Sequence, residues 1–415
     1  MSQSFTFEGI DNNLKNGSIS FTYRLSTTGN SYFFTETLTL PKPVTREVPE
    51  PVLSSILQML HLMLGISYWK LYCPKDIIIN RYTLKPSQAY FFNTLYTQGL
   101  GEFYFKNNID FRGLVSFPSD TSLESRPTKL RQNKRSLVGL GGGKDSIVVA
   151  EMLKSQNRAF DTYVVETQHH YPLIDTISSK LGKQTLMIKR MLDPQLMKLS
   201  KQPDTYNGHI PISAVYGAIG VLLCVVYDYA SVLVGNERSS SIGNTNYLGE
   251  EINHQWSKSQ TFETLFQTFI HDTISPQLNY LSLLRPLSEM QIMELFIKSP
   301  DYLSLFSSCN RNFSITHQLT HSKWCGECPK CAFVFALLAA FVSKETAIST
   351  VGKNLFAQKS LLSTYQELWG EKGVKPFECV GTPKEVTEAL SRALNKGEYK
   401  DDVIMKYFYE YIKSS

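Results

Sequence analysis

Six consecutive residues have the types and order of an anion-binding loop: Gly141, Gly142, Gly143, Lys144, Asp145 and Ser146. The glycines let backbone N–H groups approach a phosphate closely, and the N-terminus of a following helix favours its negative charge. The lysine can neutralise that charge, and the serine hydroxyl can donate to a phosphate oxygen. The segment therefore predicts a phosphate site, and the alternative is a glycine-rich turn without chemistry.

The neighbouring segments predict a strand before this loop and a helix after it. Leu137 to Leu140 is a short apolar run, and the apolar residues from Ile147 to Leu153 have helical spacing. Two commoner nucleotide motifs do not fit. A Walker A loop requires glycine where Val138 stands, and the dinucleotide fingerprint requires glycine where Lys144 stands.

A second group of residues has the spacing of a metal site. Cys325, Cys328 and Cys331 form two overlapping C-x-x-C steps, and Cys309 can complete a tetrahedral set. Thiolates this close repel each other unless a cation holds them, so the spacing favours structural Zn²⁺. The alternative is a group of buried free thiols at the start of a helix.

Two polar side chains follow the predicted strand Ser231 to Val234. We expect Glu237 to hold Mg²⁺ and Arg238 to contact a phosphate or carboxylate, because residues beyond strand ends lie at the ligand edge of a parallel sheet. The alternative is a solvated loop.

Three further side chains could transfer protons near neutral pH. His254 and Lys258 lie in the polar segment Asn253 to Ser259, and His209 precedes an apolar helix. Each also has a structural interpretation, which for His209 is a contact with the first turn of that helix.

Composition limits the class of protein. The chain has 415 residues, 42% of them hydrophobic and 19% charged, with a net charge of +5. These values are typical of a globular protein of two or three domains, and without a dense basic block they give no indication of nucleic-acid binding. No secretion leader is apparent, the apolar runs are short or interrupted, and the seven cysteines suit reduced thiols. We expect a cytoplasmic protein that does not bind membranes.

Three regions with different patterns follow one another. Residues 1–130 predict an α+β region, with strands at 19–24 and 32–40 and helices at 52–64 and 87–98. Residues 131–305 alternate strands and helices, which predicts a parallel, doubly wound α/β sheet with ligands at the carboxyl ends of its strands. Residues 306–415 hold the cysteines and three helical patterns, at 356–369, 386–394 and 403–412.

The loop resembles the PP-loop of the N-type ATP pyrophosphatases, Ser-Gly-Gly-x-Asp-Ser, with Gly141 in place of the first serine. A PP-loop domain followed by clustered cysteines is also similar to 7-cyano-7-deazaguanine synthase. The rest of the chain more closely resembles the UDP-N-acetyl-α-D-muramoyl-L-alanyl-L-glutamate epimerase family. The segments that carry this resemblance are 141–146, 207–211, 236–237, 253–259 and 324–333, together with the long N-terminal region.

The resemblance implies a PP-loop (adenine nucleotide alpha-hydrolase) fold and an ATP-dependent epimerase of peptidoglycan precursor synthesis. Its substrate would be a UDP-muramoyl dipeptide ending in L-Glu, activated as an acyl-adenylate with release of AMP and pyrophosphate. Two other functions stay open at this point. One is a deazapurine- or RNA-modifying ATP pyrophosphatase, and the other is a non-enzymatic zinc module that binds nucleotide or RNA. The sequence does not indicate the oligomeric state.

Overall fold

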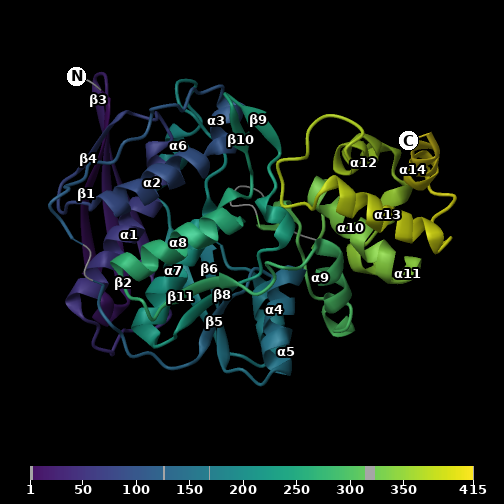
Figure 1. The fold of residues 1–415 in the computed structure, drawn as a ribbon, viewed down its shortest axis with the longest axis horizontal. Coiled ribbons are helices and arrows are strands. Elements are labelled where there is room, and N and C mark those ends of the chain that lie inside the picture. Colours follow the sequence, from purple (N-terminus) through teal and green to yellow (C-terminus); the bar gives the residue numbers. More distant parts are fainter. Residues whose placement is uncertain (1–2, 125–126, 168, 314–322, 415) are drawn as a thin grey trace.

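The computed structural model describes residues 3–124, 127–167, 169–313 and 323–414. One nine-stranded sheet runs through most of it in the order β11-β8-β5-β6-β7-β3-β2-β1-β4 (Figure 1). A separate two-stranded hairpin joins β9 (Thr245–Tyr247) to β10 (Glu250–Ile252).

Half of the large sheet is parallel, as the sequence predicts. Its strands are β5 (Ser136–Gly139), β6 (Phe160–Thr167), β7 (Thr185–Met191), β8 (Ser231–Val234) and β11 (Asn279–Ser282). Adjacent strand residues point to opposite faces, so Leu137 joins one hydrophobic core and Val138 the other. Both faces are therefore covered, by α7 (Ile212–Tyr227) on the first core and by α4 (Lys144–Ser155) on the second.

The N-terminal strands extend this sheet rather than forming one of their own. They are β1 (Ser4–Asn13), β2 (Ser18–Thr27), β3 (Asn30–Thr39) and β4 (Asp76–Ile79). The strands predicted at 19–24 and 32–40 are confirmed as β2 and β3, which form a hairpin through residues 27–30, and β3 pairs antiparallel with β7. A single hydrophobic core runs from Phe5 to Tyr280. The boundary expected near residue 130 therefore does not separate two cores, and β1 and β4 were not predicted.

The longest helix, α1 (Glu50–Trp69), could cross a membrane by length and composition, and it is the one such helix among the described residues. In its most apolar stretch of 18 residues 78% are buried, because α1 packs on β1, β2 and α7. The apolar residues of α1 are thus accounted for by the core of this fold.

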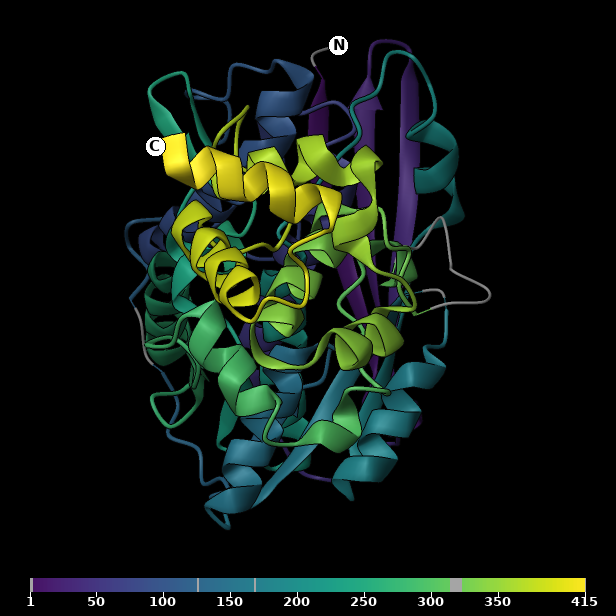
Figure 2. The same ribbon diagram turned by 90° about the vertical axis from the view of Figure 1, so that its right-hand side faces the viewer.

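The C-terminal helices gather at one end of the molecule, beyond the parallel half of the sheet (Figures 1 and 2). Helix α10 (Pro329–Phe341) is almost wholly buried and contacts α11, α12 and α13 as well as α9 (Glu289–Phe296). The helices predicted at 386–394 and 403–412 are confirmed as α13 (Pro383–Asn395) and α14 (Val403–Ser414). Of the helix predicted at 356–369, only α12 (Leu362–Trp369) is α-helical, and two 3-10 turns precede it. Helix α11 (Lys344–Val351) was not predicted.

The remaining helices connect the strands. They are α2 (Pro86–Gln98), α3 (Gly101–Asn107), α5 (Pro172–Leu181), α6 (Pro194–Leu199) and α8 (Gln260–Thr273). Helix α3 follows α2 closely, and its first residue, Gly101, lies against Ile252 of β10.

Packing of α1 on the N-terminal strands depends on Gly65. A Cβ at this position would lie 2.4 Å from Phe7 Cε1 and 3.0 Å from Tyr23 Cε1. Overpacking typically costs about 1–3 kcal/mol, whereas alanine gains about 1 kcal/mol in helix propensity. Because a 2.4 Å approach calls for the upper end of that cost, we expect Gly65→Ala to lower the free energy of unfolding by about 2 kcal/mol in urea titrations. Gly9→Ala, whose Cβ would make an ordinary 3.6 Å contact with Thr22, is the control. A Gly65→Ala protein as stable as the parent would contradict this close packing.

Candidate active site

A cavity of about 890 Å³ opens at the carboxyl ends of the parallel strands. Residues that follow β5, β6, β7 and β8 line it, as expected for a ligand site in such a sheet. The C-terminal region completes the wall with Ser307, Ser308, Lys330 and Cys379. The cavity is therefore shared between the sheet and the C-terminal helices.

The glycine loop forms part of the wall of this cavity. Gly141, Gly143, Asp145 and Ser146 line it, and α4 begins directly after Gly143. Gly142 adopts a left-handed conformation (φ +77°), and its carbonyl accepts the Ser307 N–H at 3.0 Å. A close strand–turn–helix junction of this kind presents a helix N-terminus to the cavity, which suits an anion.

The structure places Lys144 differently from the expectation that it neutralises a phosphate. Its side chain is buried, and its ammonium group contacts the carboxylates of Asp145 and Glu289 instead of lining the cavity. Burial lowers the pKa of Lys144, but these two carboxylates raise it further, so the lysine stays charged. Glu289, at the start of α9, is 145 residues away and was not predicted.

Two other residues that we expected to contact the ligand do not line the cavity. Arg238 is exposed at the start of a one-turn 3-10 helix and does not line the cavity. Glu237 is 4% exposed and does not line the cavity. Burial first, and then the charge of Asp145, raises the pKa of Glu237. Both residues thus follow the end of β8, as predicted. Neither lines the cavity, where we expected them to contact Mg²⁺ or a phosphate.

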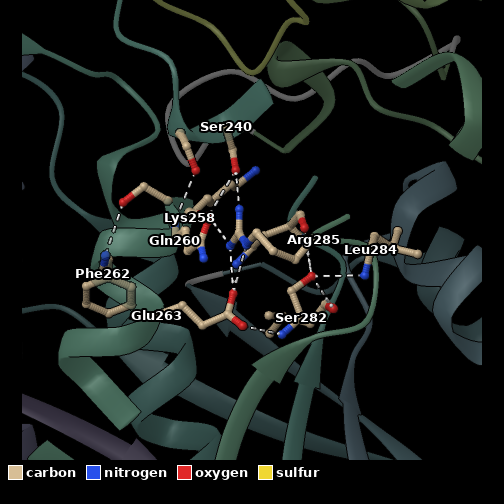
Figure 3. A network of polar contacts seen from close by, with 12 residues as sticks. Ser240, Lys258, Gln260, Phe262, Glu263, Ser282, Leu284 and Arg285 are labelled. Atoms are coloured by element: carbon tan, nitrogen blue, oxygen red, sulfur yellow. Dashed lines mark hydrogen bonds and ion pairs between the residues drawn. The ribbon is translucent and has the colours of Figure 1, made fainter. Parts of the chain in front are cut away.

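Arg285 hydrogen-bonds both the loop after β8 and the segment that contains Lys258 (Figure 3). Its guanidinium donates to the carbonyl of Glu237 at 2.9 Å, to Ser240 Oγ at 3.0 Å and to the carbonyl of Lys258 at 2.6 Å. Glu263 balances its charge through two contacts of 2.7 and 3.1 Å. Such a planar donor with fixed geometry holds both backbones in register and so fixes where Lys258 lies.

The same cavity gathers four of the titratable side chains. His209, His254, Lys258 and Cys379 all line it, which brings together the three predicted proton carriers. His254 Nδ1 contacts a carboxylate oxygen of Glu102, and the His209 and His254 rings lie 4.4 Å apart. Lys258 Nζ donates to Cys379 Sγ at 3.2 Å, and His254 also hydrogen-bonds the thiol.

The charges of this cluster follow from its contacts. Burial raises the pKa of Cys379, but the Lys258 charge and the His254 hydrogen bond outweigh it and hold that pKa at about 5. Burial lowers the pKa of His254, whereas Cys379 and Glu102 raise it to about 9. Burial and the neighbouring His254 charge lower the pKa of His209 to about 3. At neutral pH the cluster therefore holds a thiolate, an imidazolium and a neutral imidazole.

Cys379 and Glu102 were missed by the sequence analysis. Cys379 has no partner at metal-ligand spacing, and Glu102 lies in α3, a helix of seven residues without a clear apolar period. Their common signal is spatial, since residues 102, 254 and 379 meet only in the folded chain.

The four cysteines that the sequence groups together also meet in space. Their sulfur atoms all lie within 4.8 Å of one another, with Cys328–Cys331 at 3.5 Å and Cys325–Cys331 at 3.6 Å. Tetrahedral Zn²⁺ with bonds of about 2.3 Å would separate its sulfurs by about 3.8 Å. Backbone N–H groups of Cys325 and Cys331 donate to Cys309 and Cys328, each at 3.4 Å. The cluster could therefore bind zinc.

Comparison with known proteins identifies the family. One family model, the MurL N-terminal domain, matches residues 1–283, and another, the MurL C-terminal domain, matches residues 305–415. This chain belongs to the MurL family. The resemblance read from its sequence is thus confirmed, and the chain is an enzyme of the epimerase class.

Individual MurL relatives agree with this result. UDP-N-acetyl-alpha-D-muramoyl-L-alanyl-L-glutamate epimerase of Xanthomonas oryzae pv. oryzae is 38% identical over 85% of this chain and 77% of its own length. The protein of the same name from a Micromonospora species is 33% identical over 97% of this chain and 89% of its own. A solved structure, titled as a predicted subunit of tRNA methyltransferase from Methanocaldococcus jannaschii, has a TM-score of 0.25, 17% identity and coverage of 40% of this chain and 75% of that one.

The two MurL domains meet at the cavity. The glycine loop, His209, His254 and Lys258 belong to the first matched segment, whereas Ser307, Lys330 and Cys379 belong to the second. Neither domain alone supplies the whole wall.

The cysteine cluster gives a direct metal prediction. We expect purified protein to contain close to one zinc ion per chain by plasma mass spectrometry. Cys328→Ser should lose that ion and unfold at a lower temperature, because thiolate–metal bonds contribute folding energy. Cys73→Ser, at a buried thiol outside the cluster, is the matched control and should keep the metal. Parent protein that is purified without chelator and contains no zinc would contradict the site.

Proposed function

We propose that this chain converts the terminal L-Glu of UDP-MurNAc-L-Ala-L-Glu to D-Glu with consumption of ATP. The carboxylate would be activated as an acyl-adenylate, and AMP and pyrophosphate would be released. The names of the MurL relatives support the substrate. The reaction would then serve peptidoglycan precursor synthesis in the cytoplasm.

The observation that carries the ATP-dependent route is the composition of one cavity. A glycine loop at a helix N-terminus and a thiol–imidazole–ammonium cluster both line it. The first suits phosphate binding and the second suits proton transfer. The parallel sheet, the loop at its carboxyl edge and the match to Gly-Gly-x-Asp-Ser support a fold of the PP-loop type.

Activation solves a specific chemical problem. Removing the α-proton next to a free carboxylate places two negative charges side by side, so that proton is very weakly acidic. An acyl-adenylate is neutral at the acyl carbon, and its carbonyl accepts the electron pair of the broken C–H bond. A base can then take the proton, and protonation on the opposite face inverts the centre. Water finally releases AMP from the acyl group.

Mg²⁺ would accompany the nucleotide phosphates and neutralise part of their charge. Asp145 fits this role, because its carboxylate reaches the cavity wall and is 27% exposed even while it contacts Lys144. Burial raises the pKa of Asp145, but the charges of Lys144 and Lys330 lower it further, so the carboxylate is ionised.

Solvent exchange tests the proposal. With ATP, Mg²⁺ and the L-Glu precursor in D₂O, we expect deuterium at the glutamate α-carbon, together with AMP and pyrophosphate. Mass spectrometry and chiral analysis of the released glutamate measure the outcome, and omission of ATP should stop the exchange. If AMP and pyrophosphate form while the α-carbon stays protonated and L-configured, the chain does not epimerise this substrate.

The loop is tested by Asp145→Asn. We expect AMP formation to fall by about two orders of magnitude or more, as is typical when a group that stabilises transferred phosphate charge is removed. The melting temperature should change little, because Lys144 retains Glu289 as a partner. Asp301→Asn, at a carboxylate that is 67% exposed and far along the chain, is the matched control. Equal loss of AMP formation in both variants would remove the loop from the mechanism.

A further inference from the structure

Cys379 is the one cysteine in the described part of the chain that lines the cavity. It comes from the segment between α12 and α13, remote in sequence from the glycine loop and from the histidines. Its sulfur accepts the ammonium N–H of Lys258 at 3.2 Å and a hydrogen bond from His254. The cation on each of these partners favours the thiolate over the thiol.

A third residue orients this pair. Glu102 is 4% exposed and contacts His254 Nδ1, so the other ring nitrogen is left for the thiol. Burial raises the pKa of Glu102, but its hydrogen bond with His254 holds that pKa at about 2. A carboxylate thus contacts an imidazole that in turn hydrogen-bonds a thiol, which is the sequence of contacts that activates a cysteine in other enzymes.

Two contacts fix the thiol from its own side. Lys330, in the first turn of α10 and next to the cysteine cluster, donates its ammonium to the Cys379 carbonyl and its backbone N–H to Glu378 at 2.8 Å. Asn244 donates to the carbonyl of Pro376 at 2.8 Å and accepts the His254 N–H at 2.9 Å. Asn244 therefore holds the backbones of His254 and of the Cys379 segment together.

Gln255 is a further polar residue of the same cavity. It is 2% exposed, yet neither atom of its side-chain amide has a hydrogen-bond partner among the described residues. Buried amides are nearly always paired, so a polar substrate group is expected here. An amide N–H at this place could stabilise negative charge that develops on a substrate oxygen.

The predicted proton carriers are less suited to act as bases. His254 is protonated, and both ring nitrogens are engaged, so it has no free lone pair at neutral pH. Burial lowers the pKa of Lys258, but Cys379 and Glu237 raise it above its usual value, so it is an ammonium group. His209 is neutral, but its lowered pKa makes it a weak base. The thiolate is the anionic group of the cluster that faces the cavity.

We propose that the Cys379 thiolate is the base that removes the α-proton of the activated glutamate, held in place and in its charged form by His254 and Lys258. This inference rests on the proposed function and names the residue that carries its central step. A sulfur lone pair forms the S–H bond, and the C–H electron pair moves into the acyl carbonyl to give an enolate that keeps its AMP ester. A proton from cavity water then adds to the opposite face, the carbonyl re-forms, and the thiol returns its proton to water.

The first test separates adenylation from proton transfer. We expect Cys379→Ala and Cys379→Ser to release pyrophosphate in a single turnover within about tenfold of the parent, while α-deuterium incorporation falls by two to four orders of magnitude. A merely structural role would lower both rates together. Cys73→Ser, at a buried thiol outside the cavity, should leave both rates unchanged.

The second test measures the ionisation of the Cys379 thiol independently of the epimerase reaction. Iodoacetamide labelling of Cys379, followed by peptide mass spectrometry, should have an acidic midpoint near pH 5, because a lowered pKa keeps the thiolate until the pH falls through it. His254→Gln should move that midpoint upward. The charged groups that face this sulfur are Lys258, His254, Lys330, Lys375 and Glu378.

Three results would overturn the base role. They are unchanged deuterium incorporation in Cys379→Ala, a labelling midpoint near the ordinary thiol value, and an acyl–thioester on Cys379 trapped by acid quench. The last would make the sulfur a nucleophile. If the parent itself forms neither AMP nor deuterated product, the proposed function fails instead, so the two failures are distinguishable.

Discussion

The buried contact of Lys144 with Asp145 and Glu289 is the constraint on which the site depends. Removing one partner of a buried ion pair typically costs about 3–5 kcal/mol, because the other charge is left without compensation. Here the pair joins the first turn of α4 to the first residue of α9. The Glu289 N–H in turn donates to Glu385 of α13 at 2.9 Å. The glycine loop is therefore fixed to the C-terminal helices that close the cavity.

A second set of contacts joins the cavity wall to the cysteine cluster. Helix α10 begins at the cysteine cluster, with Cys328 as its N-cap, and its Lys330 holds the segment of Cys379. A zinc ion on these thiolates would thus stabilise the end of the helix that positions the proposed base. The metal site and the reactive thiol would have different chemical roles, but the first turn of α10 contacts both through Cys328, Cys331 and Lys330.

Local signals in the sequence were enough for much of the fold and for half of the site. Apolar periods predict β2, β3, α1, α7 and the parallel strands except β11, and close spacing predicts the four cysteines. β1 was missed although its register with β2 covers nearly its whole length, because β-structure depends on its partner more than on its own pattern. Lys144 and Arg238 were placed near the right strand ends, but the direction of a long side chain depends on partners far along the chain. For Lys144 that partner is Glu289, and Glu102 and Cys379 were missed for the same reason.

The charge pattern of the cavity also explains why activation must precede proton transfer in the proposed reaction. A thiolate next to an ionised substrate carboxylate would repel it by about 4 kcal/mol at 4 Å and an effective dielectric constant of 20. Adenylation removes that substrate charge, so the same thiolate can then approach the α-carbon. The cations that hold Cys379 in its charged form, Lys258 and His254, are then placed to stabilise the negative charge that the enolate gains when sulfur takes the proton. A base held by cations is weak toward an unactivated amino acid, and this weakness confines proton removal to the adenylate.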